Sequence, residues 1–596
     1  MAGTTHPLPA LWPAAQQVVR HTVDVPVPST ATVVTGRAAD RPAVDAVTEV
    51  LRGLGARKVS VVADPPRSAA LTVYVGGPAE NAHTAAALGR LKAADTGGLP
   101  AEGYVLASGR DGDGGTVALA GVDPDGTFHA AQTLRQLAAG RFLPGVVLRD
   151  WPAMKIRGVI EGFYGAPWSQ QDRLSALDFD ARMKFNTYVY SPKDDPYLRA
   201  RWRDPYPTPQ LAQIRTLVDR AARDHVRFTY ALSPGLSACY SDPADAHALV
   251  AKFESLWAIG VRAFAVPLDD ISYGAWHCAG DRSRYGGGPA AAGAAQADLL
   301  NQVQRQFIAG HPAARPLEFV PTEYHDSASS PYKTAIRTKL DPAVVVEWTG
   351  FRVVAPAITP ADAAAARKLY GHDLLVWDNY PVNDYVTNRL LLGPYVGRDP
   401  ALAGALTGIT ANPMIQEEAS RIALFGVAAY TWHPAGYDPQ AAWTAALHVV
   451  GGRAYDALRV FAENSYSSRI QPTESPTLAP LITDFWTAWA KGDPGNTAAT
   501  LSSYFATMAA APAEIRSGVD NPGLVAEIAP WLDELGGYGQ AGGHAVAMLL
   551  AKRSGDTAKA AAERAQVQAI QARVKQSAVV VGAGVLDPFL ARALDS

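Results

Sequence analysis

The sequence predicts an α/β protein with a central (β/α)8 TIM barrel, a small α/β domain before it and a helical bundle after it. Short apolar runs alternate with helical stretches eight times between Lys155 and Pro434, as in that barrel. Before Lys155 lie β-branched runs bounded by Gly, Asp or Pro, and after Pro434 only helical spacing continues. We therefore expect domains at residues 1–150, 151–435 and 436–596.

The composition is that of a globular protein with several domains. A chain of 596 residues is too long for one core, and 48% of it is hydrophobic. The formal net charge of −3 gives no reason to expect nucleic acid or a membrane surface as a partner. No apolar run approaches the roughly 20 residues of a bilayer span. The opening MAGTTHPLPALWP has neither a basic n-region nor an apolar h-region, so we expect no signal peptide in this form.

The N-terminal region is expected to support the barrel, because it shows no catalytic constellation. Its predicted helices are 43–55 and 126–140, and residues 146–152 would link it to the barrel. The predicted strands are 30–36, 58–64, 70–77, 103–109 and 116–122.

In a (β/α)8 barrel the active site lies at the C-terminal ends of the strands. Here polar or aromatic residues follow nearly every apolar run, from Glu161 after the first to Tyr430 and Trp432 in the last, which indicates an enzyme. The predicted barrel strands are 155–165, 185–195, 227–235, 263–270, 317–324, 343–350, 373–384 and 423–434. Helices are expected between them, including 208–224, 242–260 and 359–371.

The fourth predicted strand ends in two adjacent carboxylates, Asp269 and Asp270, within FAVPLDDISYG. Neighbouring side chains of a regular strand point to opposite faces. If both aspartates serve one site, they must therefore lie where the strand has ended and the backbone turns. Such a pair suits acid/base chemistry when one carboxyl is ionised and the other is held protonated by its neighbour's charge.

The two cysteines, Cys239 and Cys278, follow the third and fourth predicted strands. Because consecutive barrel strands are neighbours, both thiols are expected on one face, where a disulfide would close a separation of 39 residues. Such a bond would contribute roughly 3–4 kcal/mol and would indicate an oxidising compartment. The loop 271–295 between strand and helix is Gly/Ala-rich, and we expect it to be mobile or to shape the substrate site.

The C-terminal region is expected to form a helical bundle beside the barrel. The predicted helices are 441–465, 479–493, 496–518, 524–537 and 560–577.

Several long motifs resemble glycoside hydrolase family 84, the family of bacterial β-N-acetylglucosaminidases and of O-GlcNAcases. They are collinear and spread over the predicted barrel, and the order of the flanking domains is similar to that of the family's secreted bacterial members. The motifs are RGVIEGFYGAPWSQQDR (157–173), YSPKDDPYLRARWRDPYP (190–207), LDDI (268–271), VPTEY (320–324), VWDNYPVNDY (376–385), LLGPYVGR (391–398) and ANPM (411–414).

The resemblance implies a retaining hydrolase in which the 2-acetamido oxygen of the sugar attacks the anomeric carbon and forms an oxazoline. Asp269 would orient the acetamido N–H and stabilise the oxazolinium charge. Asp270 would protonate the leaving oxygen and then deprotonate the incoming water. Tyr324 would donate to the acetamido oxygen, and Trp377 would wall its methyl pocket. The remaining residues implied to bind the sugar are Gly162, Lys193, Asn379, Asp384 and Asn412.

Three of these residues also have plainer interpretations. Lys193 could pair with Asp194 or Asp195, Gly162 could mark a tight strand exit, and Asn412 could cap a helix that begins after it.

The resemblance implies a GlcNAc-terminated glycan or an O-GlcNAc-modified peptide as the substrate, and a secreted protein. No residue cluster suggests a metal site or another cofactor, and the implied chemistry needs none. Two alternatives are a hydrolase of a larger GlcNAc-containing glycan, as a hyaluronidase is, and a catalytically silent sugar-binding barrel. Retention of both aspartates, Tyr324 and Asn379 favours an enzyme over the silent barrel.

Overall fold

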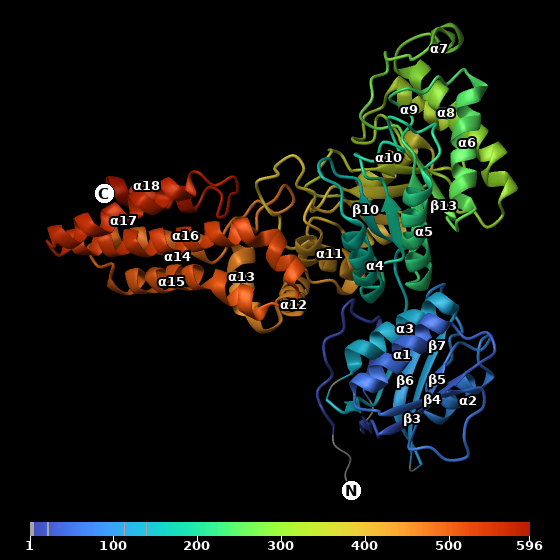
Figure 1. Cartoon of the computed structure of the whole chain (residues 1–596), viewed down its shortest axis with the longest axis horizontal. Coiled ribbons are helices and arrows are strands. Elements are labelled where there is room, and N and C mark those ends of the chain that lie inside the picture. Colours follow the sequence, from blue (N-terminus) through green and yellow to red (C-terminus); the bar gives the residue numbers. More distant parts are fainter. Residues whose placement is uncertain (1–4, 21–22, 113, 139) are drawn as a thin grey trace.

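The computed structural model describes residues 5–20, 23–112, 114–138 and 140–596. Figure 1 shows a small sheet domain at the N-terminus, a barrel with its helices, and a long helical arm that extends sideways from the barrel. In the described residues, no helix has the length and apolar character that a membrane crossing requires. The fold class expected from the sequence is confirmed by the closed barrel and its two flanking parts.

The N-terminal domain is a seven-stranded sheet in the order β1-β9-β6-β7-β5-β3-β4 with helices on both faces. Val33 packs with α1 and α3, whereas its neighbour Val34 packs with α2, as the alternation of a strand requires. Its strands are β1 (Gln17–Arg20), β3 (Thr30–Thr35), β4 (Lys58–Val62), β5 (Leu71–Val75), β6 (Tyr104–Asp111), β7 (Gly114–Gly121) and β9 (Val146–Asp150), and β2 (Val25–Pro26) pairs with β8 (Phe142–Leu143). Its helices are α1 (Arg41–Gly53), α2 (Ala82–Arg90) and α3 (Pro124–Leu137).

The segment 146–152, which we expected to be a linker, belongs mostly to this sheet. Its strand β9 pairs antiparallel with β1 and with β6, so the chain enters the barrel directly from a sheet strand.

The barrel has eight parallel strands, and it closes where β17 pairs with β10. Seven of the predicted strands lie where the apolar runs placed them. The strands are β10 (Ile156–Glu161), β11 (Thr187–Tyr190), β12 (Arg227–Ala231), β13 (Ala263–Pro267), β14 (Glu318–Val320), β15 (Val345–Trp348), β16 (Leu374–Asp378) and β17 (Gly408–Ala411). The helices around them are α4 (Gln170–Arg182), α5 (Thr208–Arg223), α6 (Pro243–Trp257), α7 (Ala279–Tyr285), α8 (Pro289–Gln306), α9 (Pro331–Lys339), α10 (Pro360–Tyr370) and α11 (Glu417–Trp432).

The prediction of an eighth strand at 423–434 is wrong, because those residues lie almost entirely in helix α11. This helix is buried on nearly every side, so its sequence lacks the polar stripe that marks a surface helix. Its apolar run has the pattern that is also expected of a buried strand. Tyr430 and Trp432 therefore do not belong to the catalytic rim. The Trp432 indole donates to Asp150 Oδ1 of the N-terminal sheet at 3.0 Å.

The prediction that 271–295 is one long loop is wrong in part. Helix α7 and the first turns of α8 occupy its second half, where Pro289 begins α8.

The C-terminal region is helical, as expected, but its helices have different limits. The predicted helix 441–465 is divided near Gly452, and the predicted helix 524–537 continues to Arg553. Gly536 and Gly537, where the predicted helix ended, lie inside α16, and a Cβ there would lie 3.1 Å from Pro512 of α15 and 2.9 Å from Val574 of α17, respectively. The helices are α12 (Pro439–Gly451), α13 (Tyr455–Glu463), α14 (Leu478–Lys491), α15 (Gly495–Gly518), α16 (Pro522–Arg553), α17 (Thr557–Val574) and α18 (Leu586–Asp595).

A largely buried histidine joins the N-terminal domain to the barrel. His225, just before β12, contacts Asp125 Oδ1 at 2.6 Å and both carboxylate oxygens of Asp40 at 3.1 Å. Burial disfavours the charged imidazole, but the two carboxylates outweigh it and raise the pKa of His225 to about 9.

Candidate active site

A cavity of about 550 Å³ lies at the C-terminal end of the barrel strands. The structure brings together there every residue that the sequence implied for catalysis and sugar binding, although their individual roles stay predictions. The nine residues are Gly162, Lys193, Asp269, Asp270, Tyr324, Trp377, Asn379, Asp384 and Asn412.

The aspartate pair lies beyond the end of β13, where we expected the backbone to turn. Strand β13 ends at Pro267, and Asp270 has a φ of 53° in the left-handed region. This conformation is uncommon outside glycine and breaks the alternation of a strand. Both carboxylates therefore line the same cavity.

Asp269 is paired with a lysine from another strand end. Lys193 Nζ donates to Asp269 Oδ2 at 3.0 Å, and both side chains are largely buried. The plainer interpretation, a pair with Asp194 or Asp195, is wrong. The ammonium also lies 5.2 Å from the centre of the Trp377 ring, which holds the charge against the cavity floor.

Asp270 is contacted by two tyrosine hydroxyls. Tyr164 donates to Oδ2 at 2.8 Å and Tyr324 donates to Oδ1 at 3.0 Å. Burial and the nearby carboxylate raise the pKa of both tyrosines, so both hydroxyls are neutral donors. The expected contact of Tyr324 with an acetamido oxygen stays a prediction.

One wall of the cavity is a network of side-chain amides around an indole. Trp377 Nε1 donates to Asn379 Oδ1 at 2.9 Å, and Asn412 Nδ2 donates to the same oxygen at 3.0 Å. Asn412 is not a helix cap, since α11 begins only at Glu417. It follows directly after β17, so its place on the rim results from the strand that the sequence analysis missed.

Gly162 is required by the close approach of Trp377. A Cβ at this position would lie 2.3 Å from Trp377 Cζ2, closer than any real side-chain contact. The Gly162 N–H also donates to Asn412 Oδ1 at 3.3 Å. The residue is therefore more than a tight strand exit.

Two buried glutamates lie inside the barrel below the aspartate pair, and the sequence analysis did not single them out. Glu318 on β14 and Glu347 on β15 are fully buried, and neither Glu347 oxygen has a hydrogen-bond partner among the described residues. Burial raises the pKa of Glu318 to about 7. Burial, Glu318 and Asp269 raise the pKa of Glu347 well above its usual range.

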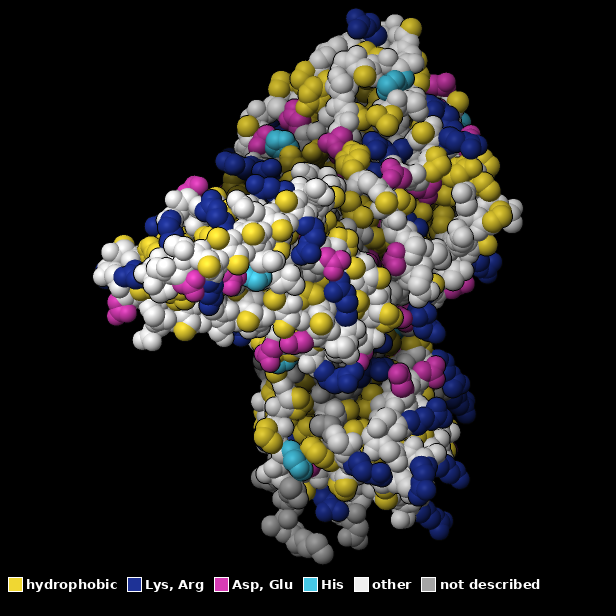
Figure 2. All heavy atoms as spheres, turned by 60° about the vertical axis from the view of Figure 1, so that its left-hand side comes forward, with side chains coloured by type: hydrophobic (Ala, Val, Ile, Leu, Met, Phe, Trp, Pro, Cys, Tyr) yellow, Lys and Arg dark blue, Asp and Glu magenta, His cyan; other side chains and the backbone are white. Residues whose placement is uncertain are grey.

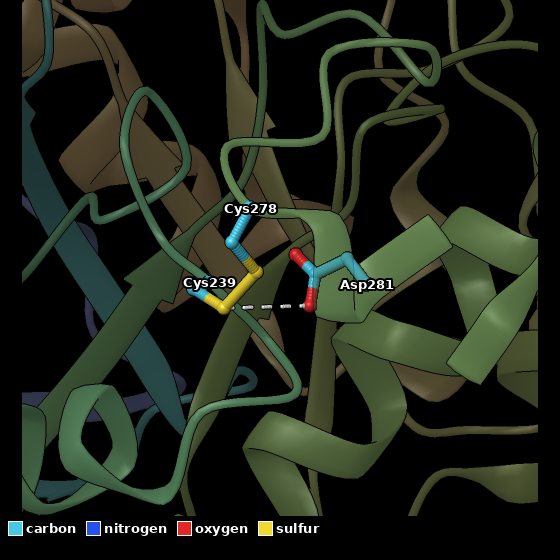
Figure 3. Close-up of side chains that lie close together, drawn as sticks. All are labelled: Cys239, Cys278 and Asp281. Carbon is cyan, nitrogen blue, oxygen red and sulfur yellow. Dashed lines mark hydrogen bonds between the residues drawn. A yellow bond between two sulfur atoms is a disulfide. The ribbon is translucent and has the colours of Figure 1, made fainter. Parts of the chain in front are cut away.

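The predicted disulfide is present and braces the loops beside the site. Cys239 and Cys278 are bonded with their Cα atoms 5.6 Å apart, as Figure 3 shows. Asp281 of α7 lies against them and accepts the Ser241 N–H at 2.7 Å and the Tyr240 N–H at 3.1 Å. The side chains of Cys239, Cys278 and Asp281 lie close enough together to bind a metal ion. The two sulfur atoms are bonded to each other, however, so neither is a thiolate that could be a ligand.

Parts of the cavity wall were not predicted from the sequence. Tyr164 lines the cavity two residues after Gly162 and is 42% exposed. The signal available in the sequence was an aromatic residue at the end of a predicted strand. The segment 351–354 and Arg469 also line the cavity, and nothing in the local sequence marked them.

A closed parallel barrel with a carboxylate pair, amides and aromatic side chains in one rim cavity is the architecture of a glycoside hydrolase. The family model described as beta-N-acetylglucosaminidase matches residues 157–463, which is more than half of the chain. The chain therefore belongs to the beta-N-acetylglucosaminidase family, which is glycoside hydrolase family 84. Two further models flank it, glycosyl hydrolase family 20 domain 2 at residues 8–151 and hyaluronidase post-catalytic domain-like at 477–590.

Two mammalian proteins named Protein O-GlcNAcase are similar to about half of the chain. The Rattus norvegicus protein is 34% identical over 317 residues, which are 52% of this chain and 32% of that protein. The Mus musculus protein is 34% identical over 282 residues, which are 46% of this chain and 30% of that protein. This chain thus spans about a third of the length of these relatives.

Two solved structures show similarity over larger parts. The structure of CpGH84B has a TM-score of 0.87 and 27% identity, and the match covers 98% of this chain and 99% of that one. A variant of the Thermobaculum terrenum O-GlcNAc hydrolase has a TM-score of 0.69 and 30% identity, with 74% of this chain and 95% of that chain covered.

Proposed function

We propose that this protein is a retaining exo-β-N-acetylglucosaminidase of the O-GlcNAcase type, in which the substrate's 2-acetamido group is the nucleophile. The observation that carries the proposal is the different partner of each carboxylate in one cavity. Asp269 contacts the Lys193 ammonium, whereas Asp270 contacts two neutral hydroxyls. Two carboxyl groups in distinct environments can take distinct roles in one reaction.

In the first step the acetamido oxygen bonds to the anomeric carbon while the bond from that carbon to the leaving oxygen breaks. Asp269 accepts a hydrogen bond from the acetamido N–H and stabilises the positive charge that develops on the oxazolinium ring. Asp270 gives its proton to the leaving oxygen, so the aglycone departs as an alcohol.

In the second step water bonds to the anomeric carbon and the oxazoline ring opens. Asp270, now a carboxylate, takes the proton of this water and returns to its starting state. Two displacements at the same carbon retain the configuration.

The cavity also offers groups for the sugar itself. Asp384 has one carboxylate oxygen held by the Tyr164 N–H at 2.9 Å, and it would accept hydrogen bonds from the O4 and O6 hydroxyls. The Trp377 ring would wall the pocket for the acetamido methyl group, and Tyr324 would turn from Asp270 to the acetamido oxygen.

The substrate class we propose is a GlcNAc-terminated glycan or an O-GlcNAc-modified peptide. Support comes from the rat and mouse relatives, which are named for O-GlcNAc hydrolysis. We also propose that the protein is secreted, and the bond between Cys239 and Cys278 supports an oxidising compartment.

The test is the initial rate of hydrolysis of an aryl β-N-acetylglucosaminide by the wild type, Asp269→Ala and Asp270→Ala. We expect both variants to lose at least about 100-fold in kcat. Asp270→Ala should recover on aryl groups that leave without a proton, whereas Asp269→Ala should not. In a series of N-fluoroacetyl substrates the wild-type rate should fall steeply with each fluorine, because fluorine withdraws electrons from the attacking oxygen.

Rates that are indifferent to fluorination would require a nucleophile from the enzyme and would refute the mechanism. Sugar binding without turnover by the wild type would establish the silent barrel. Release of internal fragments from a long GlcNAc-containing glycan, rather than terminal sugar, would establish the larger-glycan alternative.

A further inference from the structure

The mouth of the cavity carries two arginines that the proposed reaction does not use. Arg352 lies in the segment after β15, and Arg469 lies in the segment between α13 and α14. Both side chains are exposed and both line the cavity. Figure 2 shows Lys and Arg side chains gathered in the angle between the barrel and the helical arm.

Neither guanidinium has a carboxylate partner in the described part of the chain. Each lies instead near an aromatic ring, with Arg352 Cζ 5.8 Å from the centre of Phe351 and Arg469 Cζ 4.9 Å from the centre of Tyr385. A guanidinium beside an aromatic ring can still present N–H donors to an anion, and Arg469 also hydrogen-bonds to the Tyr385 side chain.

The segment that carries Arg352 is fixed to the floor of the site. Thr349 Oγ1 donates to the Arg352 carbonyl at 2.9 Å, and Asn379 Nδ2 donates to the next carbonyl, that of Val353, at 2.8 Å. Because Asn379 also belongs to the amide network around Trp377, the arginine is positioned relative to the bound sugar.

The segment that carries Arg469 is fixed by a buried carboxylate. Glu474 accepts the N–H groups of Tyr466 at 3.2 Å and Ser467 at 3.0 Å, and it pairs with Arg389 at 2.9 Å. The backbone of Arg469 is therefore held before a ligand binds, which lowers the entropy lost on binding.

The charged side chains of the cavity differ between its inner part and its mouth. The inner carboxylates of Asp269 and Asp270 have their own partners, Asp326 pairs with Lys333, and Asp384 accepts the Tyr164 N–H. Among the described residues that line the cavity, the two cations without a carboxylate partner, Arg352 and Arg469, lie at its mouth beside Val353 and Tyr385, which are each 43% exposed. A leaving group that extends outward from the anomeric carbon would therefore pass over a basic and partly apolar surface.

We propose that Arg352 and Arg469 form a subsite for a carboxylate on the leaving group, so that the preferred substrates carry GlcNAc on an acidic aglycone. The inference rests on the proposed function, because it concerns the group that the reaction releases. The planar guanidinium fork matches the two oxygens of a carboxylate. A uronic acid sugar and an acidic peptide both supply this chemistry.

The test compares kcat/KM for two aryl β-N-acetylglucosaminides, one with a 4-carboxylate and one with the neutral 4-carboxamide on the leaving group. Two exposed charge pairs predict a roughly three- to thirtyfold preference of the wild type for the carboxylate at low salt. The preference should shrink toward one at 1 M salt, where the Debye length is about 3 Å.

The variants Arg352→Gln and Arg469→Gln should each lower the ratio of carboxylate to carboxamide rates, and the double variant should abolish the preference. The reversals Arg352→Glu and Arg469→Glu should favour the carboxamide. Arg215→Gln, on the outside of helix α5 and 65% exposed, is the matched control and should keep the wild-type ratio. Because each result is a ratio of two rates measured on the same variant, a general loss of activity lowers both rates and leaves the ratio unchanged.

Equal ratios in the wild type and in the double variant, with both substrates hydrolysed, would overturn the subsite and leave the proposed function intact. Failure to hydrolyse either substrate would instead refute the proposed function. A disaccharide of GlcNAc on a uronic acid, compared with its carboxyl-reduced form, and an acidic O-GlcNAc peptide, compared with its amidated form, then identify the source. The pair with the larger salt-sensitive ratio marks the natural leaving group.

Discussion

The substitution Gly162→Ala tests whether the floor of the cavity depends on the contact between strand β10 and the Trp377 ring. The new Cβ would stand 2.3 Å from Cζ2 and 2.8 Å from Cη2 of Trp377, so the ring must move by more than about 1 Å to restore an ordinary contact. The ring is held by its Nε1 bond to Asn379 and by the nearby Lys193 ammonium, so its movement displaces both. Overpacking of this kind costs about 1–3 kcal/mol of stability.

We expect Gly162→Ala to lower kcat/KM on an aryl β-N-acetylglucosaminide roughly 100-fold, because a displacement of about 1 Å in a positioning group has that effect. The measurements are steady-state kinetics and chemical denaturation. Gly404→Ala is the control, since nothing lies within 4 Å of its new Cβ, and it should change neither. The double variant Gly162→Ala with Trp377→Phe should regain stability relative to Gly162→Ala. Activity within twofold of the wild type would refute the reasoning.

Three further predictions concern stability. Glu347 is buried, has a raised pKa and has no hydrogen-bond partner among the described residues, so Glu347→Met should stabilise the protein by about 1–3 kcal/mol at pH 8. The gain should be much smaller below pH 4.5, where the unfolded state is also protonated. An equal gain at both pH values in urea denaturation would contradict this. The pKa of His225 is raised to about 9, so its charge stabilises the fold fully below pH 6.5, and this stabilisation is lost as the pH rises to 9. His225→Gln should therefore lower the free energy of unfolding by about 2–3 kcal/mol at pH 6 and by little at pH 9.5. A loss of stability that does not depend on pH would point to packing alone. Cys239→Ser with Cys278→Ser should lose roughly 3–4 kcal/mol, and the wild type should show the same loss in reductant, whereas the variant should be insensitive to it.

The sequence predicted the barrel well because parallel strands covered on both faces leave an apolar run with a polar end. Seven strands carried that signal. The eighth, β17 (Gly408–Ala411), is as long as β11 and β15, but its sequence GITA is less apolar than the helix that follows it. A weakly apolar strand beside a fully buried helix is the case in which periodicity cannot choose between the two.

The site was predictable where its residues sit at strand ends and was not predictable where distant segments meet. All nine implied residues line the cavity, because motif positions at strand ends converge in a closed barrel. Arg469 comes from the helical region and reaches the mouth through a loop held by Glu474. Glu318 and Glu347 share the barrel interior only because β14 and β15 are neighbours. These residues are brought together by tertiary packing, which a local sequence pattern does not predict.

The partners of the aspartate pair explain how two adjacent carboxyl groups can hold different roles. The Lys193 ammonium has only donors, so its 3.0 Å contact suits Asp269 as a carboxylate and offers nothing to an acid proton. A tyrosine hydroxyl both donates and accepts, so Tyr164 and Tyr324 can bond Asp270 with or without its proton. In the proposed mechanism Asp270 can therefore keep its contact with Tyr164 in both charge states, whereas Tyr324 would turn to the acetamido oxygen. The Lys193 contact supports Asp269 in one charge state, the carboxylate, which is the state that the proposed mechanism assigns to it.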